Sequence, residues 1–467
     1  MLLGPRTSAV RGVRGLFRST AAWTAHLSPS HPAQVIVLGF GAAILVGTAL
    51  LLIPTSKVGA GGATFLEALF TATSAVCVTG LIVVDTPVYW TGAGQVIILA
   101  LIQVGGFGIM SFASLLGVLL ARRLGLRSRI FAAAETKSVG FGDVRNILVG
   151  VLRITLLVEA VTAVLLAARF LLGYGYGFGE ALWLGVFHSV SAFNNAGFAL
   201  FSDSLIGYAG DPWICLPICA AVIIGGLGFP VLFELRRHFR YPHKWHMNTK
   251  LVLSGSVVLL VIGSVVITAV EWSNPATLGV LRPGERILAG FFQSTMTRTA
   301  GFNSVDFAQL NPVTLLVIDV LMFIGGGPAG TAGGLKITTF GVLFFIVYTE
   351  IRGGTAVNVF DKRLPRSAHR QAISIVLLAV GLVISATIFL MLTTDFGLDR
   401  ILFEVVSAFA TVGLSTGITA GIHPAGQVVL ILVMFAGRLG PVTLASALAL
   451  RSKPLYYEYP KERPLIG

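Results

Sequence analysis

Four short stretches of small, hydroxyl-bearing and glycine residues are the most informative chemical feature of the sequence. They are SAVCVTGL (74–81), SAFNNAGF (191–198), TMTRTAGF (295–302) and SAFATVGL (407–414). In each, a serine or threonine stands six positions before a glycine, and a large hydrophobic residue follows the glycine. The backbone carbonyls of such stretches can replace the water shell of a cation without adding fixed charge.

The residues whose carbonyls could face a shared axis form four sets, one for each stretch. They are Val76, Cys77, Val78, Thr79 and Gly80; Asn194, Asn195, Ala196 and Gly197; Arg298, Thr299, Ala300 and Gly301; and Ala410, Thr411, Val412 and Gly413. Inward-facing carbonyls need unusual backbone angles, which the glycines tolerate. We predict four short extended strands, each held by the hydroxyl six residues upstream. The helix before each strand would point its partly negative C-terminal end at the axis and favour a cation.

Arg298 departs from this pattern, because it places a basic side chain three residues before Gly301. Two orientations are open. A side chain directed away from the axis would pack behind its strand, whereas one directed into the axis would repel cations.

A run of glycines and a proline interrupts a long apolar stretch of the chain. It comprises Gly325, Gly326, Gly327, Pro328, Ala329, Gly330, Thr331, Ala332, Gly333 and Gly334. Within a helix, glycine and proline cost about 1 and 3 kcal/mol relative to alanine. Irregular backbone at membrane depth is tolerated only where it lines a cavity or is covered by protein. We predict a flexible loop that plugs the passage and acts as its gate; a static helix kink is the alternative.

Four ionisable residues lie within apolar stretches, where burying a charge is costly and points to function. Lys336 follows the predicted loop, and Arg438 could bond the carbonyls of that loop and hold it shut. Snorkelling or a structural ion pair is the alternative for Arg438. Glu159 and Asp319 are each expected to pair with a basic residue, and Arg153 is the neighbour of Glu159 in sequence; a role in binding a coupling ion is the alternative.

The composition indicates an all-α polytopic membrane protein. Of the 467 residues, 55% are apolar and 11% are charged, compared with about 25% charged in a soluble protein. The net charge of +13 comes largely from basic residues between apolar runs, which fits the positive-inside rule better than nucleic-acid binding. The sequence contains no P-loop or dinucleotide fingerprint. We therefore expect no enzymatic activity, no covalent or organic cofactor and no nucleic-acid partner.

Apolar runs predict eight transmembrane helices, with a short, half-polar helix inside each pair. The long runs cover 33–53, 93–121, 146–172, 212–236, 250–271, 312–350, 371–393 and 425–450, and the short ones 62–75, 180–192, 285–296 and 400–409. The short helices cannot cross a bilayer and read as re-entrant segments. Glycine-rich landmarks at 105–108, 225–228, 325–327 and 437–440 follow the four stretches in turn. The chain therefore divides into four parallel span–pore helix–span repeats with pseudo-fourfold symmetry around a central pore.

The predicted domains follow these repeats. Repeats 1 to 4 cover 33–121, 146–236, 250–350 and 371–450, between a basic N-terminal segment (1–32) and a C-terminal tail (451–467). Basic residues concentrate near 122–137, 236–250, 352–370 and 451–463, and acidic residues such as Asp85, Asp203 and Asp306 occupy the other connections. The basic side should be cytoplasmic, which predicts a multi-pass protein of the cell membrane with both termini in the cytoplasm. The acidic side could concentrate cations at the mouth of the pore, although ordinary solvated loops are the alternative.

The arrangement resembles the Trk/Ktr/HKT superfamily of potassium transporters. TSAVCVTGLIVVDT and HSVSAFNNAGF look like the first and second filters of that family, GGGPAGTAGGLKITT like its intramembrane loop, and GRLGPVT like its fourth inner helix. Eight spans without an extra leading pair resemble the KtrB-type membrane subunit rather than TrkH. The resemblance implies potassium uptake, a homodimer and a cytoplasmic nucleotide-binding ring of the KtrA/TrkA type as partner. Some sodium-selective members carry serine where this chain has Gly80, which favours potassium.

These features together predict a potassium-selective, channel-like membrane subunit, with K⁺ held by filter carbonyls and Na⁺ left open as a coupling or activating ion. Lipid and a second copy of the chain are expected neighbours. A sodium-coupled or sodium-transporting carrier with alternating access is the first alternative, although such carriers often have inverted repeats. A membrane assembly subunit that transports nothing is the second, and it would have no use for four filter-like stretches.

Overall fold

The computed structural model describes residues 32–123 and 141–440, and these residues are predominantly helical. The predicted N-terminal segment, the basic connection after 123 and the C-terminal tail lie outside the described residues. The helices in the apolar runs predicted to cross the membrane are α2 (Pro32–Leu51), α5 (Gly92–Arg123), α7 (Phe141–Tyr174), α9 (Pro212–Leu227), α11 (Met247–Glu271), α13 (Pro312–Phe323), α14 (Ile337–Ile351), α15 (Arg366–Thr393) and α17 (Pro424–Leu439). The predicted re-entrant helices are α3 (Phe65–Val76), α8 (Phe178–Phe193), α12 (Pro283–Met296) and α16 (Leu398–Ala410), and two further helices are α4 (Thr86–Tyr89) and α10 (Phe229–His238).

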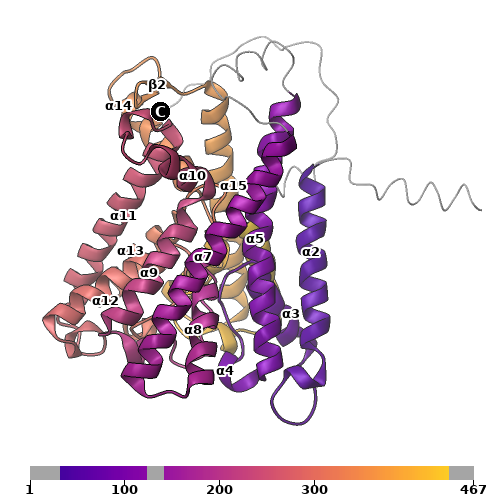
Figure 1. Ribbon diagram of the computed structural model, residues 1–467. Coiled ribbons are helices and arrows are strands. Elements are labelled where there is room, and N and C mark those ends of the chain that lie inside the picture. The colour runs from indigo at the N-terminus through magenta and orange to yellow at the C-terminus, as the bar shows by residue number, and fades with distance from the viewer. Residues whose placement is uncertain (1–31, 124–140, 441–467) are drawn as a thin grey trace, which may run out of the picture.

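A small hairpin and several 3₁₀ turns complete the described elements. The hairpin pairs β1 (Asn358–Val359) antiparallel with β2 (Lys362–Arg363). The 3₁₀ turns cover Pro54–Ser56, Ile206–Tyr208, Pro242–Lys244, Leu278–Val280, Phe307–Gln309 and Thr419–Gly421. In Figure 1, α3, α8 and α12 lie toward one end of the bundle, and α10, α14 and the hairpin lie at the opposite end.

Several helices could cross a membrane. Within the described ranges, four helical segments are long and apolar enough: Gln34–Leu51, Leu148–Tyr174, Met247–Glu271 and Arg366–Thr393. A fifth candidate is the bent pair α9 and α10, and α5, α13, α14 and α17 contribute shorter apolar helices. The chain is therefore a multi-pass membrane protein. The prediction of eight crossings remains a prediction.

The helices fall into four groups, numbered in chain order: α2, α3 and α5; α7, α8 and α9; α11, α12 and α13; and α15, α16 and α17. The last helix of each group, α5, α9, α13 or α17, is called its inner helix. The short helices α3, α8, α12 and α16 join the groups into a ring. Three of them pack between the two long helices of their own group: α3 between α2 and α5, α8 between α7 and α9, and α16 between α15 and α17. Each group also contacts the next one, through the pairs α5–α8, α9–α12 and α13–α16, and α17 returns to α3. The last group therefore packs against the first.

Sequence signals fix where three of the inner helices begin. The side chains of Asp211, Asn311 and His423 accept hydrogen bonds from the backbone N–H groups of Trp213, Val313 and Ala425. A proline follows each capping residue as the first residue of α9, α13 and α17. Proline is well suited to this position, because its missing N–H would have no partner there. The inner helices of groups 2, 3 and 4 thus start in the same way.

Glycines bring the inner helices close to the short helices. A Cβ atom at Gly105, Gly225 or Gly437 would overlap the carbonyl oxygen of Val76, Phe193 or Phe409, respectively. These three carbonyls lie in the last turns of α3, α8 and α16. The third group differs, because a Cβ at Gly325 would overlap the carbonyl of Gly333 within the glycine-rich loop.

The prediction of one continuous helix over 212–236 is wrong. The helix breaks at Gly228, and α9 and α10 are inclined by 99° to each other. Gly228 has φ +88° and ψ 144°, a combination that essentially only glycine adopts. Pro230 then occupies the first turn of α10. α17 ends in the same manner at Gly440, with φ +84°; the remainder of the span predicted to reach 450 lies outside the described residues.

The bend at Gly228 gives a stability prediction. Gly228→Ala should lower the free energy of unfolding by about 1–3 kcal/mol, because alanine is strained at this φ and ψ and its Cβ would overlap the carbonyl of Pro328. The measurement is thermal unfolding of the purified protein in detergent. Gly381→Ala in α15 is the control: its Cβ meets nothing within 4 Å, so stability should stay equal or rise by up to about 1 kcal/mol. Equal midpoints for the two variants would contradict this view of the bend.

Candidate functional site

The glycines of the four stretches form a closed ring in chain order. A Cβ atom on Gly80 would overlap the carbonyl oxygen of Ala196, and one on Gly197 would lie 3.0 Å from the carbonyl oxygen of Ala300. The pattern continues from Gly301 to Val412 and from Gly413 back to Thr79. At each step, a glycine faces the carbonyl of the residue that precedes the next glycine. The chain thus brings together four segments that are each separated by about a hundred residues in sequence.

A second ring position is formed by residues in the left-handed backbone region. Two residues before each glycine, φ is +54° at Val78, +58° at Asn195, +70° at Thr299 and +51° at Thr411. Such angles are uncommon outside glycine, and a β-branched residue rarely adopts them. The prediction of extended strands is therefore wrong: each segment turns at this residue and again at its glycine. Strain of this kind gathers at functional sites, where the surroundings hold it in place.

In the residue before each ring glycine, the backbone N–H is hydrogen-bonded to the preceding helix, whereas the carbonyl is not hydrogen-bonded within the described chain. The amides of Thr79, Ala196, Ala300 and Val412 donate back to the last turns of the preceding helices, at 2.7–3.0 Å. Across residues 32–123 and 141–440, no N–H or O–H group donates to the carbonyl oxygens of these four residues. The ring therefore presents carbonyl oxygens whose acceptor capacity the described chain does not use, which is the chemistry that a dehydrated cation requires.

Three of the four predicted hydroxyl braces are confirmed. Ser74 and Ser407 accept from the backbone N–H groups of Gly80 and Gly413, each at 3.0 Å. Ser191 donates to the carbonyl of Phe198 at 2.8 Å. The prediction is wrong for Thr295, which donates to Phe291 within its own helix.

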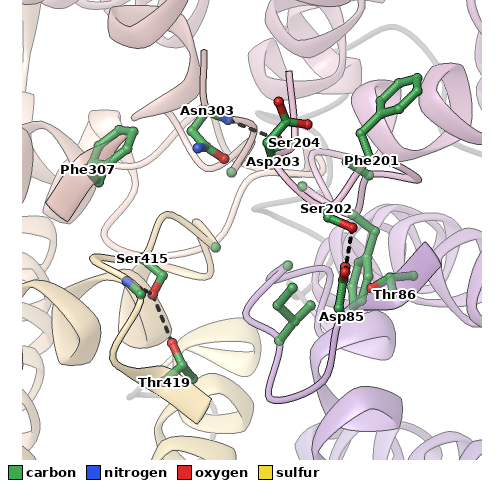
Figure 2. A pocket seen from close by; sticks show the side chains of 18 of the residues that line it. Asp85, Thr86, Phe201, Ser202, Asp203, Ser204, Asn303, Phe307, Ser415 and Thr419 are labelled. Carbon is green, nitrogen blue, oxygen red and sulfur yellow. Dashed lines mark hydrogen bonds between the residues drawn. The ribbon is translucent and has the colours of Figure 1, made fainter. Parts of the chain in front are cut away.

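An acid-lined hollow opens on one side of the ring. A cavity of about 480 Å³ is lined by Gly80, Gly197, Gly301 and Gly413 together with Asp85, Asp203 and Asp306, and its lining contains no lysine or arginine. Figure 2 shows that the residues around this hollow, among them Asp85, Asp203 and Ser415, come from different parts of the chain. Ser202 donates to Asp85 at 2.5 Å, and Ser415 and Thr419 lie 3.0 Å apart. Three carboxylates without lining bases favour cations at this mouth.

Glu404 is a further residue of this site that the sequence motifs do not single out, and it hydrogen-bonds residues that line the cavity. Its side chain is fully buried in α16. Its carboxylate accepts hydrogen bonds from the hydroxyls of Ser415 and Thr419, at 2.6 and 2.8 Å, and from the backbone N–H of Thr416, at 2.9 Å. An acidic residue within the apolar stretch 401–410 is the signal that could have found it.

The glycine-rich loop packs against the inner end of α9. Gly327 and Thr331 donate backbone hydrogen bonds to the carbonyls of Gly226 and Gly225, at 2.8 and 3.2 Å. Phe229 donates in return to the carbonyl of Ala329 at 3.3 Å. The two ends of the loop are joined by hydrogen bonds from Gly325 to Leu335 and from Ile337 to Gly326. The interruption predicted between 312 and 350 is therefore a compact loop, which separates α13 from α14.

The basic residues near the loop bond its carbonyls. Arg438 is buried and donates to the carbonyls of Thr331 and Gly105, the second at 3.2 Å. Lys336 donates to the carbonyl of Ala332. Arg298 donates to Ser256 at 3.3 Å and to the carbonyl of Gly325 at 3.5 Å. Of its two orientations, Arg298 adopts the one that packs behind its segment, toward α11.

The predicted pairing of the buried acids with basic residues is wrong among the described residues. Glu159 accepts from the Nδ2 of Asn194 at 3.1 Å and from the Nε2 of Gln103 at 3.3 Å, whereas Arg153 is exposed. The Oδ1 of Asp319 is buried, and no partner for it is found in the described part of the chain. Glu159 therefore helps to fix the amide of Asn194, the first residue of the second segment, together with the Oε1 of Gln103 at 2.8 Å and the carbonyl of Val190 at 3.0 Å.

Apolar helices, a ring of unused carbonyls and an acid-lined mouth define a multi-pass membrane transport protein. Residues 15–455 match the TrkH family of cation transport proteins. The chain belongs to this family, which confirms the resemblance to the Trk and Ktr proteins.

Several relatives are similar over nearly their whole length. The chain is 39% identical to Ktr system potassium uptake protein B of Vibrio alginolyticus, over 93% of this chain and 94% of that protein. It is 37% identical to the protein of the same name from Bacillus subtilis, over 93% and 97% of the two chains. It is 34% identical to potassium/sodium uptake protein NtpJ of Enterococcus hirae, also over 93% and 97%.

A solved structure shares the fold. The potassium transporter TrkH from Vibrio parahaemolyticus superposes with a TM-score of 0.70, covering 89% of this chain and 84% of that one. The two sequences are only 19% identical, so this likeness concerns the fold alone.

The contacts of Glu159 give a second stability prediction. Glu159→Ala should lower the free energy of unfolding by about 1–3 kcal/mol, because the Nε2 of Gln103 loses its acceptor and the Nδ2 of Asn194 loses one of its three acceptors. Thermal unfolding in detergent measures this loss. Glu350→Ala, at an exposed position in the last turn of α14, should shift stability by no more than about 0.5 kcal/mol. A Glu159 variant as stable as the Glu350 variant would rule out a role in fixing Asn194.

Proposed function

We propose that the chain is the potassium-selective, ion-translocating membrane subunit of a Ktr-type uptake system. The closed ring of glycines and unused carbonyls is the observation that carries this proposal. Four equivalent segments around one axis can surround a monovalent cation with oxygens, and uncharged oxygens also let it leave. Two relatives with the highest identities given above are named potassium uptake proteins.

In this proposal the filter consists of the predicted segments 76–80, 194–197, 298–301 and 410–413. The contacts of the inner helices with successive short helices support four repeats about a pseudo-fourfold axis, with eight crossings of the membrane. The short helices act as pore helices, whose C-terminal ends lie beside the filter and favour a cation. The acid-lined mouth faces outward and raises the local cation concentration.

The gate is the glycine-rich loop 325–334. Support comes from its burial and from its hydrogen bonds to α9 and Arg438, which hold it below the ring. Conduction requires the loop to move aside. Arg438, which contacts both the loop and group 1, is the residue that pins the closed position; Lys336 bonds the loop from its C-terminal side.

The remaining features of the proposal rest on the family. Both termini are cytoplasmic, the protein is a homodimer, and a nucleotide-binding ring of the KtrA/TrkA type docks on the cytoplasmic side. The exposed basic residues Arg236, Arg237 and Arg240 near α10, and Arg363 and Arg366 near the hairpin, fit a cytoplasmic face under the positive-inside rule.

A sodium-transporting or sodium-coupled carrier is the alternative function. This alternative is supported by the name of the Enterococcus hirae relative, potassium/sodium uptake protein. Flux into vesicles that saturates with K⁺ and requires Na⁺ would support the carrier, whereas K⁺ flux without Na⁺ would support the channel-like subunit.

Substitutions in the ring test the filter. In purified protein reconstituted into vesicles, Gly80→Ser and Gly301→Ser should each lower the K⁺/Na⁺ flux ratio at least about tenfold, a change of about 1.4 kcal/mol in discrimination. The reason is steric: a Cβ at either position would displace the facing carbonyl of Ala196 or Val412. Gly381→Ser in α15 is the control and should behave as wild type. An unchanged ratio in both ring variants would refute carbonyl coordination here.

Removal of the Arg438 side chain tests the gate. Arg438→Ala should raise K⁺ flux about tenfold, because a hydrogen bond from a charged donor contributes about 1.5–3 kcal/mol and its loss favours the open loop. Vesicle flux is the measurement, and Arg370→Ala, at an exposed position of α15, is the control. Equal flux in wild type and Arg438→Ala would argue for a purely structural arginine.

A further inference from the structure

Thr331, in the glycine-rich loop, forms hydrogen bonds with three different parts of the molecule. Its backbone N–H donates to Gly225 at the end of α9, at 3.2 Å. Its carbonyl accepts from Arg438. Its hydroxyl donates to the Oδ1 of Asn195 at 3.0 Å. Thr331 is 1% exposed, so water does not compete readily for these contacts.

Asn195 extends this connection into the ring. It is the left-handed residue of the second segment, and its Nδ2 lies 3.3 Å from the carbonyl oxygen of Arg298 and 3.4 Å from the hydroxyl of Thr299. A backbone carbonyl can only accept, so this contact fixes the amide with Nδ2 toward the third segment. The Oδ1 atom then necessarily faces Thr331. The side chain of Asn195 therefore joins the second segment, the third segment and the loop.

The loop also contacts the fourth segment at the same level. A Cβ atom on Gly333 would overlap the hydroxyl of Thr411 and lie 3.0 Å from the carbonyl oxygen of Ala410. Thr411 is the left-handed residue of its segment. The loop is therefore seated directly against the ring of left-handed residues, with one polar bond, from Thr331 to Asn195, between the loop and the side chains of that ring.

From this geometry we propose that Thr331 is a positioning residue for the selectivity filter: the closed loop, through Asn195, holds the second and third filter segments in register. This inference rests on the proposed function and deepens it. The loop then does more than block the passage. When it leaves, Asn195 loses one of the contacts that orient its amide, and the filter loses support on one side. Gate position and ion discrimination are coupled through a single hydrogen bond.

The test is a Thr331→Val substitution, which keeps the shape of the side chain and removes its hydroxyl. K⁺ and Na⁺ fluxes are measured separately in vesicles that contain the full-length protein. The expected result is a rise in total flux of about three- to tenfold, the factor for one buried hydrogen bond, with a fall in the K⁺/Na⁺ ratio of similar size. Thr331→Ser should restore both values, because it keeps the hydroxyl.

A double-mutant cycle identifies the bond itself. Asn195→Ala, Thr331→Val and the combined variant are compared, and coupling through this contact requires the double variant to change the flux ratio less than the product of the single effects. Thr338→Val, in the first turn of α14, is the matched control for a lost threonine hydroxyl and should resemble wild type.

The outcomes separate this inference from the function on which it rests. Higher flux with an unchanged K⁺/Na⁺ ratio in Thr331→Val, or single effects that multiply in the double variant, would overturn the coupling while leaving the filter intact. Wild-type vesicles without K⁺-selective flux would overturn the proposed function, and the coupling with it.

Discussion

The contact between each glycine and the carbonyl of the next segment is the constraint on which the structure depends. Gly80, Gly197, Gly301 and Gly413 approach their neighbours so closely that there is no room for a methyl group at three of the four positions and little at the fourth. The surroundings serve this approach: short helices end beside the ring, inner helices pack tightly behind it, and serine hydroxyls hold three of the turns. One non-glycine residue per segment has a positive φ and stores strain that such dense support maintains.

Buried polar side chains stabilise the ring from three sides. Glu404 holds the outer connection of the fourth segment through Ser415 and Thr419. Glu159 fixes the second segment from behind through Asn194. The loop approaches from the inner side, where Arg438 ties it to group 1. Satisfied polar networks of this kind rigidify a structure and specify a single arrangement, so the chain itself holds the oxygens of the ring in fixed positions.

Much of this architecture could be predicted from the sequence, and the predictions that were wrong have physical explanations. Four recurring glycines and one glycine-rich interruption placed the ring and the loop correctly, because few other residues tolerate those conformations. The bend at Gly228 was missed, since Gly105-Gly106-Phe107-Gly108 has a similar pattern yet remains helical within α5; only the following Pro230 distinguishes the two. The partners of Glu159 could not be predicted either, because Arg153 is near in sequence whereas Asn194 and Gln103 approach only after folding.

The origin of all four ring segments in one chain has an evolutionary consequence. In a pore built from identical subunits, one amino-acid change alters every quarter at once. Here the left-handed position is valine in one quarter (Val78), asparagine in another (Asn195) and threonine in the other two (Thr299 and Thr411). Under the proposed function, a lineage can therefore retune ion preference in small increments, one quadrant at a time, while three unaltered quadrants preserve a working passage.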